Sequence, residues 1–164
     1  MTPPKASPDD CNLCPRTSVS EVEEGHRLAP RFPADGLMPC ITTDAADGTV
    51  LMLGWMNDQA LRLTIKTGEA HYFSRARQAV WHKGATSGLT QSVVRMRIDD
   101  DQDAIWLQVT VAGNGASCHI GYRSCFYREV PVGPAAGGPL RFTETQRRFD
   151  PVAVYGDAPN PTIL

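Results

Sequence analysis

Four carboxylates occur within five residues, in the run Asp99-Asp100-Asp101-Gln102-Asp103. Negative charges this close together repel one another unless solvent or a cation lies between them. In an extended or turning backbone, Asp99, Asp101 and Asp103 point to one side, because side chains alternate with a period of two. Carboxylate oxygens are the ligands that Mg²⁺ prefers, so the run predicts a divalent-cation site, with a solvated acidic turn as the plainer alternative.

A second group of candidate ligands follows further along the chain. Cys118 and Cys125 are seven residues apart, and His119 comes directly after the first of them. Two thiols and an imidazole could supply ligands to Zn²⁺ and leave an open position for an activated water. Alternatively, both cysteines are small buried hydrophobic residues and His119 is a hydrogen-bonded core histidine. The spacing alone leaves both interpretations open.

Basic and aromatic side chains gather between residues 72 and 88. Guanidinium forks, an ammonium, hydroxyls beside glycine and an aromatic face together suit a phosphorylated aromatic ligand. An ordinary basic loop with a half-buried tryptophan would explain each residue separately, but not their clustering. The candidate ligand-binding residues are Arg75, Arg77, Trp81, Lys83, Thr86 and Ser87.

The elements that would position these residues are mostly strands. One helix is expected over the segment DQALRLTIKT, capped by Asn57 and ended by Gly68. Many strands with one main helix, without repeated βα alternation, predict a β-rich α+β fold of mainly antiparallel strands. The apolar or alternating runs that predict strands are residues 49–55, 70–74, 92–98, 104–111 and 124–130.

The two ends of the chain differ from this central part in composition. Residues 1–30 are rich in Pro, Ser, Asp and Glu with little apolar periodicity, which predicts a mobile N-terminal extension. Residues 131–164 begin with PVGPAAGGP, which breaks both helices and strands, and are expected to form a Gly/Pro-rich C-terminal tail. The working domain is therefore predicted to comprise residues 31–130.

Composition argues against several classes of partner. A chain of 164 residues can build one core, and its formal net charge of -2 offers no field for nucleic acid or an acidic membrane. No run is long and apolar enough to span a bilayer and no signal peptide is visible, so a cytoplasmic location is expected. Five cysteines without an export signal favour reduced thiols, and Cys11 and Cys14 form a lone C-x-x-C pair.

Several segments between about Asp35 and Arg128 form recognisable motifs in a fixed order. They are DGLMPCITTD, GTVLMLGWMN, TGEAHYFSRAR, WHKGATSG, QSVVRMRIDDDQD and CHIGYRSCFYR. Taken together they resemble the phosphoribosyl-AMP cyclohydrolases of histidine biosynthesis. For the fold, the resemblance implies a β-rich α+β homodimer with active sites at the subunit interface.

For chemistry, the resemblance implies hydrolysis between N1 and C6 of the adenine ring in 1-(5-phosphoribosyl)-AMP, which opens the ring to a formamidino carboxamide. His119 and Lys83 are the expected catalytic residues, and Arg123 joins the expected phosphate-binding residues. The implied ligands are Asp99, Asp101 and Asp103 for Mg²⁺, and Cys118 and Cys125 for Zn²⁺ or another transition metal.

Three positions depart from the family pattern. Asp100 stands where the family has a cysteine that would join the two other thiols across the dimer interface, and a carboxylate there should weaken the preference for Zn²⁺ over Fe²⁺, Mn²⁺ or Co²⁺. Ala85 replaces a glutamate and Ile120 a threonine, which bears on activity or substrate choice. Two alternatives therefore stay open: a paralogue acting on a related cyclic amidine or N-substituted purine, and a non-catalytic metal- or nucleotide-binding protein.

Overall fold

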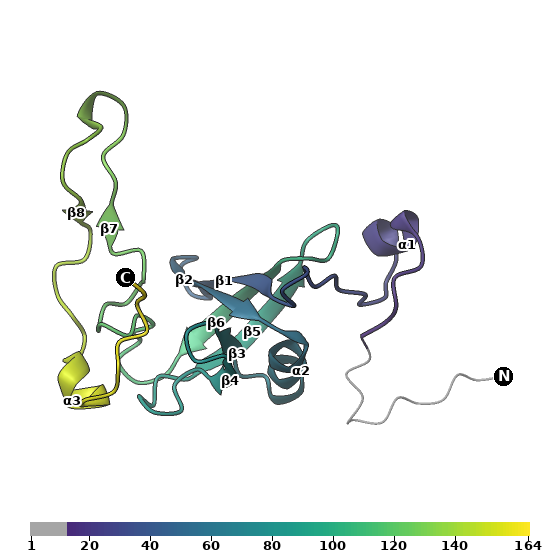
Figure 1. The fold of residues 1–164 in the computed structure, drawn as a ribbon, viewed down its shortest axis with the longest axis horizontal. Helices are drawn as coiled ribbons and strands as arrows, with labels where there is room; N and C mark the ends of the chain where they lie inside the picture. Colours follow the sequence, from purple (N-terminus) through teal and green to yellow (C-terminus); the bar gives the residue numbers. More distant parts are fainter. Residues whose placement is uncertain (1–12) are drawn as a thin grey trace.

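A four-stranded sheet forms the centre of the molecule. The computed structural model describes residues 13–164, so Cys11 of the C-x-x-C pair lies outside the described residues. The strands run in the order β2-β1-β6-β5 (Figure 1), with β1–β2 and β5–β6 antiparallel and β1–β6 parallel. The predicted strand-rich α+β fold is confirmed, whereas the parallel pair was not predicted. The bounds are Met38–Asp44 for β1, Val50–Met56 for β2, Gln91–Ile98 for β5 and Ile105–Val111 for β6.

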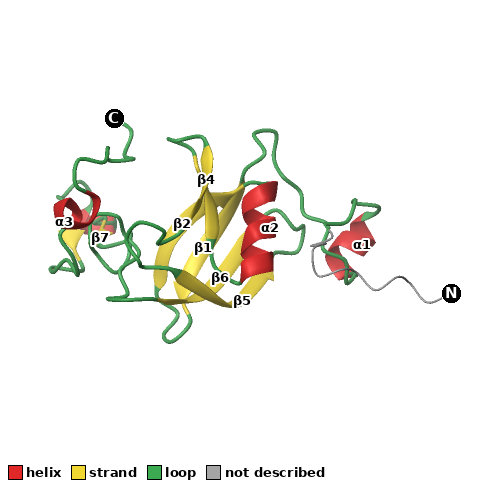
Figure 2. Ribbon diagram, turned by 90° about the horizontal axis from the view of Figure 1, so that it is seen from below, coloured by secondary structure: helices red, strands yellow, loops and turns green. Residues whose placement is uncertain are grey.

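Helix α2 (Asp58–Thr67) confirms the predicted helix. The Asn57 side chain accepts a hydrogen bond from the backbone N–H of Ala60, and Gly68 follows the last turn with a φ of 72°. Figure 2 shows α2 lying across the strands. Its apolar side packs into the core, which also takes buried side chains from β1, β2 and β6.

A hairpin lies beside α2 on the same face of the sheet. Its strands are β3 (His71–Ser74) and β4 (Ala79–His82). Tyr72 is buried, and its hydroxyl hydrogen-bonds to Thr42 of β1 and to the side chain of Gln91 on β5. These bonds attach the hairpin to the sheet, and they thereby fix the end of β4, where Lys83 follows.

The two terminal segments lie at opposite ends of the sheet, as Figures 1 and 2 show from two directions. Helix α1 (Val19–Glu24) lies next to the turn between β5 and β6. None of the helices in residues 13–164 is long and apolar enough to cross a bilayer. The short elements at the other end are β7 (Arg128–Glu129), β8 (Arg141–Phe142), a 3-10 turn (Gly133–Ala135) and α3 (Pro151–Tyr155).

The described part of the N-terminal extension packs against the domain. Its composition favoured a mobile segment, yet Val22 and Ala29 are buried in the structure. The backbone N–H of Arg31 also donates to the carbonyl of Gln102, in the turn before β6. Residues 13–31 are thus attached to the acidic run.

The strand predicted over residues 124–130 is wrong for most of its length. Only Arg128–Glu129 pair with another strand, and that partner is β8 in the C-terminal segment. The backbone N–H of Ser124 donates to a side chain, the Glu144 carboxylate, and that of Cys125 donates to the carbonyl of Leu51. Residues 124–127 therefore form a loop with irregular bonding, although their side chains are typical strand formers.

Candidate active site

The acidic run forms a tight turn that brings three carboxylates together. One Asp99 carboxylate oxygen accepts hydrogen bonds from the backbone N–H groups of Asp103 and Ala104, at 2.9 and 3.0 Å. Gln102 takes a left-handed conformation, with a φ of 58°, and closes the turn. As a result, ligand oxygens of Asp99, Asp101 and Asp103 all lie within 4.8 Å of one another. The convergence predicted for an extended or turning backbone is present, and the backbone turns here.

The charges of this turn fit a hard cation. The pKa of Asp103 is raised by its removal from water and then by the negative charges of Asp101 and Asp99, while Arg31 lowers it. The Arg31 guanidinium is 3.8 Å from the Asp103 carboxylate, too long for a strong pairing. A divalent cation between the three carboxylates would relieve this repulsion with the oxygen ligands that Mg²⁺ prefers.

Asp100 lies outside the group of three converging carboxylates. It lines a cavity of about 360 Å³ between the turn and α1, together with Glu23, His26 and Asp99. Cys118 and Cys125 lie in the loop that follows the far end of β6, a seven-residue strand that spans about 20 Å at ~3.3 Å per residue. Within residues 13–164 no group of three converging ligands includes a thiol.

The two thiols face each other in the loop of residues 117–125, which we call the thiol loop. A hydrogen bond from Cys125 is the main reason that the pKa of Cys118 falls to about 7; the Ile120 backbone N–H and Lys83 add to this, and burial opposes it. The pKa of Cys125 is raised correspondingly, by the same bond and by burial. A thiol with a lowered pKa is suited to binding a soft metal ion, because the thiolate is the form that binds.

Lys83 places a buried ammonium beside these thiols. Only 6% of the residue is exposed, and its Nζ donates to the carbonyl of Ser117 at 2.7 Å. Burial lowers the pKa of Lys83, whereas the nearby Cys125 and Cys118 raise it. The Nζ also lies 5.3 Å from the centre of the Trp81 ring. The structure thus gathers Lys83, Trp81 and both thiols.

His119 presents a nitrogen without a partner. Its Nε2 is buried and has no hydrogen bond within the described residues. Burial lowers the pKa of the ring, a hydrogen bond with Asn160 raises it, and the charge of Lys83 lowers it. A neutral imidazole with one unbonded nitrogen can accept or deliver a proton at neutral pH.

The predicted ligand-binding residues on and after the hairpin form a basic, aromatic surface. Arg77 lies 5.6 Å from the centre of the Trp81 ring, on the ring that Lys83 also approaches. Arg75 lies instead over Trp55, at 4.8 Å. Thr86 is exposed, and the Ser87 hydroxyl accepts from the backbone N–H of Leu89. Arg77 is therefore closer to the Lys83 group than Arg75 is.

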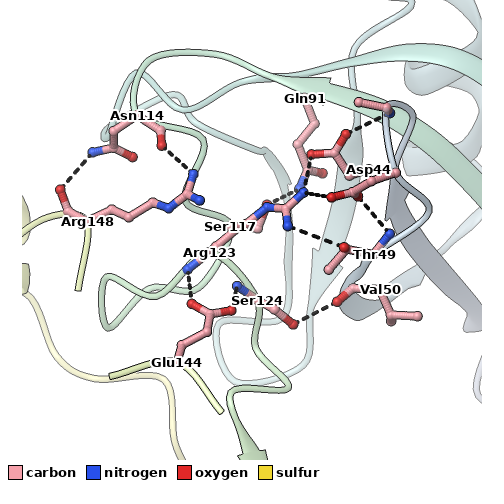
Figure 3. A network of polar contacts seen from close by, with 12 residues as sticks. Asp44, Thr49, Val50, Gln91, Asn114, Ser117, Arg123, Ser124, Glu144 and Arg148 are labelled. Carbon is pink, nitrogen blue, oxygen red and sulfur yellow. Dashed lines mark hydrogen bonds and ion pairs between the residues drawn. The ribbon is translucent and has the colours of Figure 1, made fainter. Parts of the chain in front are cut away.

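Arg123 is engaged in ion pairs within the chain (Figure 3). Its guanidinium lies 3.0 Å from the Asp44 carboxylate and 2.9 Å from that of Asp47, and it also donates to the Thr49 hydroxyl. These bonds attach the thiol loop to the turn between β1 and β2. In this structure, Arg123 holds the loop in place, and its expected role in phosphate binding stays a prediction.

Comparison with known proteins places the chain in a family. A family model described as phosphoribosyl-AMP cyclohydrolase matches residues 52–127. A phosphoribosyl-AMP cyclohydrolase of Bradyrhizobium diazoefficiens is 57% identical over 135 residues, which cover 82% of this chain and 94% of that protein. A second, from Rhodopseudomonas palustris, is 47% identical over 94% of this chain and 97% of its own length. The chain belongs to the phosphoribosyl-AMP cyclohydrolase family.

The family model ends at residue 127, but the contacts of the thiol loop extend beyond that residue. Glu144 and Asn160 bond to this loop from the C-terminal segment, and sequence reasoning named neither. Gln91 was also missed: its buried amide donates to the Ser117 hydroxyl and to the Met52 sulfur. A buried amide inside a strand was the one signal that could have pointed to Gln91.

Proposed function

We propose that this chain hydrolyses the N1–C6 bond of the adenine ring in 1-(5-phosphoribosyl)-AMP, the cyclohydrolase step of histidine biosynthesis. Its identity of about half or more to phosphoribosyl-AMP cyclohydrolases, over nearly their full length, carries the proposal. The grouping of a thiol pair, a buried ammonium and an imidazole with a free nitrogen supports it, because such a set suits attack by water on an electron-poor ring.

The proposed reaction adds water across one bond. The N1 ribosyl substituent leaves the ring cationic and C6 electron-poor, so water oxygen bonds to C6, the N1–C6 bond breaks, and N1 takes up a proton. His119 would accept a proton from the attacking water and return one to N1, since its Nε2 is unbonded and burial lowers the pKa of the ring. Trp81 would stack on the base of the substrate. Arg77 and Lys83, which lie beside the Trp81 ring, would attract the substrate phosphates.

Two metal sites are proposed. Asp99, Asp101 and Asp103 would hold Mg²⁺, supported by their convergence and mutual repulsion. Cys118 and Cys125 would hold Zn²⁺ or another transition metal with Asp100 of the partner subunit, and such a metal would supply a water ionised near neutral pH. The exchange of a soft thiolate for a carboxylate at Asp100 should widen the choice of metal toward Fe²⁺, Mn²⁺ and Co²⁺.

A homodimer would complete this second site. Asp100 and the thiols occur near opposite ends of β6, so one chain supplies only part of the ligand set. The face of the sheet opposite α2 also exposes apolar side chains: Ile41 is 43% and Leu53 48% exposed, and they are cross-strand neighbours. Ile41 also pairs in register with Trp106 of β6. A second copy covering this face would bury these side chains.

The test is ultraviolet-monitored turnover of 1-(5-phosphoribosyl)-AMP. The protein is stripped of metal and reconstituted with Mg²⁺ together with Zn²⁺, Fe²⁺, Mn²⁺ or Co²⁺ in parallel. Ring opening with at least one pair is expected, and the preferred metal reports on Asp100. A folded protein that fails with every pair would contradict the proposal. Turnover of another N-substituted purine nucleotide would then favour a paralogue in which Ala85 and Ile120 are the first residues to revert.

A further inference from the structure

The C-terminal segment contacts the thiol loop through one carboxylate. The two Glu144 oxygens accept separate hydrogen bonds from consecutive backbone N–H groups, those of Arg123 at 2.8 Å and Ser124 at 3.0 Å (Figure 3). Hydrogen bonds from backbone N–H groups to a carboxylate are among the stronger ones in proteins. Cys125 is the next residue along the chain, so this carboxylate fixes the backbone directly before a thiol.

The same stretch of backbone is held from its other side by β2. The Ser124 hydroxyl donates to the carbonyl of Val50 at 2.7 Å, and the backbone N–H of Cys125 donates to that of Leu51 at 2.7 Å. Within the loop, the carbonyl of Arg123 also accepts from the backbone N–H of Ser117 at 3.0 Å. Glu144 supplies the restraint on the edge opposite β2, since it alone bonds the N–H groups of Arg123 and Ser124 within the described residues.

Glu144 is itself placed by the packing of its own segment. The backbone N–H of Thr143 donates to the carbonyl of Tyr127 at 2.8 Å, just beyond the β7–β8 pair. Tyr127 stacks on Tyr122 of the thiol loop, with ring centres 4.1 Å apart, and Phe142 packs against both. The Glu144 carboxylate is thus held next to the loop by an aromatic cluster that includes a residue of the loop, Tyr122.

A second attachment lies four residues after Glu144. The backbone N–H of Arg148 donates to the carbonyl of Gly121 at 2.7 Å. Gly121 has a φ of 99°, and a Cβ there would lie 2.3 Å from the carbonyl oxygen of Phe149. The segment therefore follows the thiol loop closely over its whole turn, and Glu144 is the charged side chain of that segment that bonds the loop backbone.

We infer that Glu144 is a positioning residue for ring opening: its bridging carboxylate sets the backbone of residues 123–125 so that the Cys118 and Cys125 sulfurs face each other. The inference rests on the proposed function for its catalytic consequence. The Glu144 hydrogen bonds go to backbone N–H groups and not to either sulfur, and no substrate contact is assigned to it. It therefore acts through the loop backbone. An amide in its place would offer one acceptor and one donor, and could accept from only one of the two N–H groups.

The experiment compares Glu144→Gln and Glu144→Ala with the control Glu129→Gln, an exposed acid on the neighbouring β7. In metal-free protein, mild oxidation with diamide followed by mass spectrometry measures how fast the Cys118–Cys125 disulfide forms. We expect this rate to fall by about 10-fold in Glu144→Gln and further in Glu144→Ala, because the sulfurs then face each other less often. The control should form it at the wild-type rate.

Steady-state kinetics give the second measurement. Since loop-orienting partners of metal ligands typically contribute 10–100-fold, kcat should fall by about that factor in Glu144→Gln, with KM changed by less than about 3-fold. Wild-type disulfide rate and kcat in a folded Glu144→Gln protein would overturn the inference. If the wild-type protein itself opens no ring, the proposed function fails, while the disulfide rates still decide the positioning role. Glu144→Gln preserves side-chain volume, so it carries the test if Glu144→Ala unfolds.

Discussion

The acidic turn and the thiol loop flank the same strand, β6, but they are built in different ways. The acidic turn is closed largely by its own residues, because Asp99 accepts from the N–H groups of Asp103 and Ala104, four and five positions later. The thiol loop has backbone bonds of its own, such as that from the Cys118 N–H to the carbonyl of Tyr122, but it is also held by β2 and by the C-terminal segment around Glu144. The carboxylates of the turn are thus brought together by a side chain of the turn itself, whereas the backbone before Cys125 also depends on segments distant in sequence.

The difference suggests a division of tasks. Mg²⁺ usually keeps several waters and takes few ligands from the protein, so a short turn could supply the carboxylates that it needs. Two thiols for a soft metal need closer control of direction and separation. The more elaborate support is found where the chemistry is more demanding.

The largest effect is expected from removing a thiol. Cys118→Ser should lower kcat/KM by about 1000-fold or more, because a hydroxyl stays protonated near neutral pH and is a poor ligand for a soft metal. Thermal unfolding should change little, since Ser is nearly isosteric with Cys. Full activity in the variant, reconstituted with the same metals, would show that the thiol pair lies outside the reaction.

The acidic turn should respond in a graded way. Asp99→Asn keeps a side-chain oxygen that accepts from Asp103 and Ala104, but it loses one charge, so activity should fall by about 100-fold at low Mg²⁺ and recover in part at high Mg²⁺. Asp99→Ala loses the turn bonds as well, and raising Mg²⁺ should not restore it. Mg²⁺ titrations of turnover distinguish the two. Equal behaviour of both variants would contradict a turn that is closed locally by this side chain.

A substitution of Gln102 changes the acidic turn and leaves the residues of the thiol loop as they are. Its buried amide accepts from the N–H of Ala29 and donates to the carbonyls of Val22 and Arg27, which attaches residues 13–31 to the turn. Gln102→Leu leaves these groups unpaired, so the free energy of unfolding should fall by about 2 kcal/mol in urea titrations. The rate of Cys118–Cys125 disulfide formation should stay at the wild-type value, and a parallel loss there would show that the two loops are coupled through the fold.

The smallest expected effect is a change in the pH at which Cys118 forms its thiolate. The pKa of Cys118 is lowered to about 7, so its thiolate should form as pH rises through about 7 and be lost by protonation below it. In metal-free protein, the thiolate absorbance of wild type minus Cys118→Ser should therefore show a step near pH 7. Metal affinity should weaken as pH falls below that step, because protons then compete for the sulfur. A single absorbance step near the ordinary pKa of a thiol would contradict the lowered pKa of Cys118.

The same contrast explains what could be predicted from the sequence. Helix α2 was predicted between Asn57 and Gly68 because both of its ends are marked by residues that act locally. The convergence of the three aspartates was predicted because it depends on spacing within one short run. Long-range partners give no such signal.

Arg123 and Glu144 show this limit. The sequence did not predict that the Arg123 guanidinium pairs with Asp44 and Asp47, more than seventy positions earlier in the chain. Glu144 lies in a tail whose composition predicted only breaks in structure, and its two backbone partners precede it by about twenty residues. An ionic or bridging role of this kind depends on how the segments pack together, which periodicity and composition do not encode.

The most direct test is to ask whether the acidic turn and the thiol loop of different subunits form one site. We would mix two inactive proteins, Cys125→Ser and the double variant Asp100→Ala with Asp101→Ala, under conditions that exchange subunits. A shared site predicts that activity returns to about one quarter of the wild-type level, because half of the dimers are mixed and each holds one intact site of two. Activity that stays at the level of the separate variants, although mass spectrometry detects mixed dimers, would contradict the account.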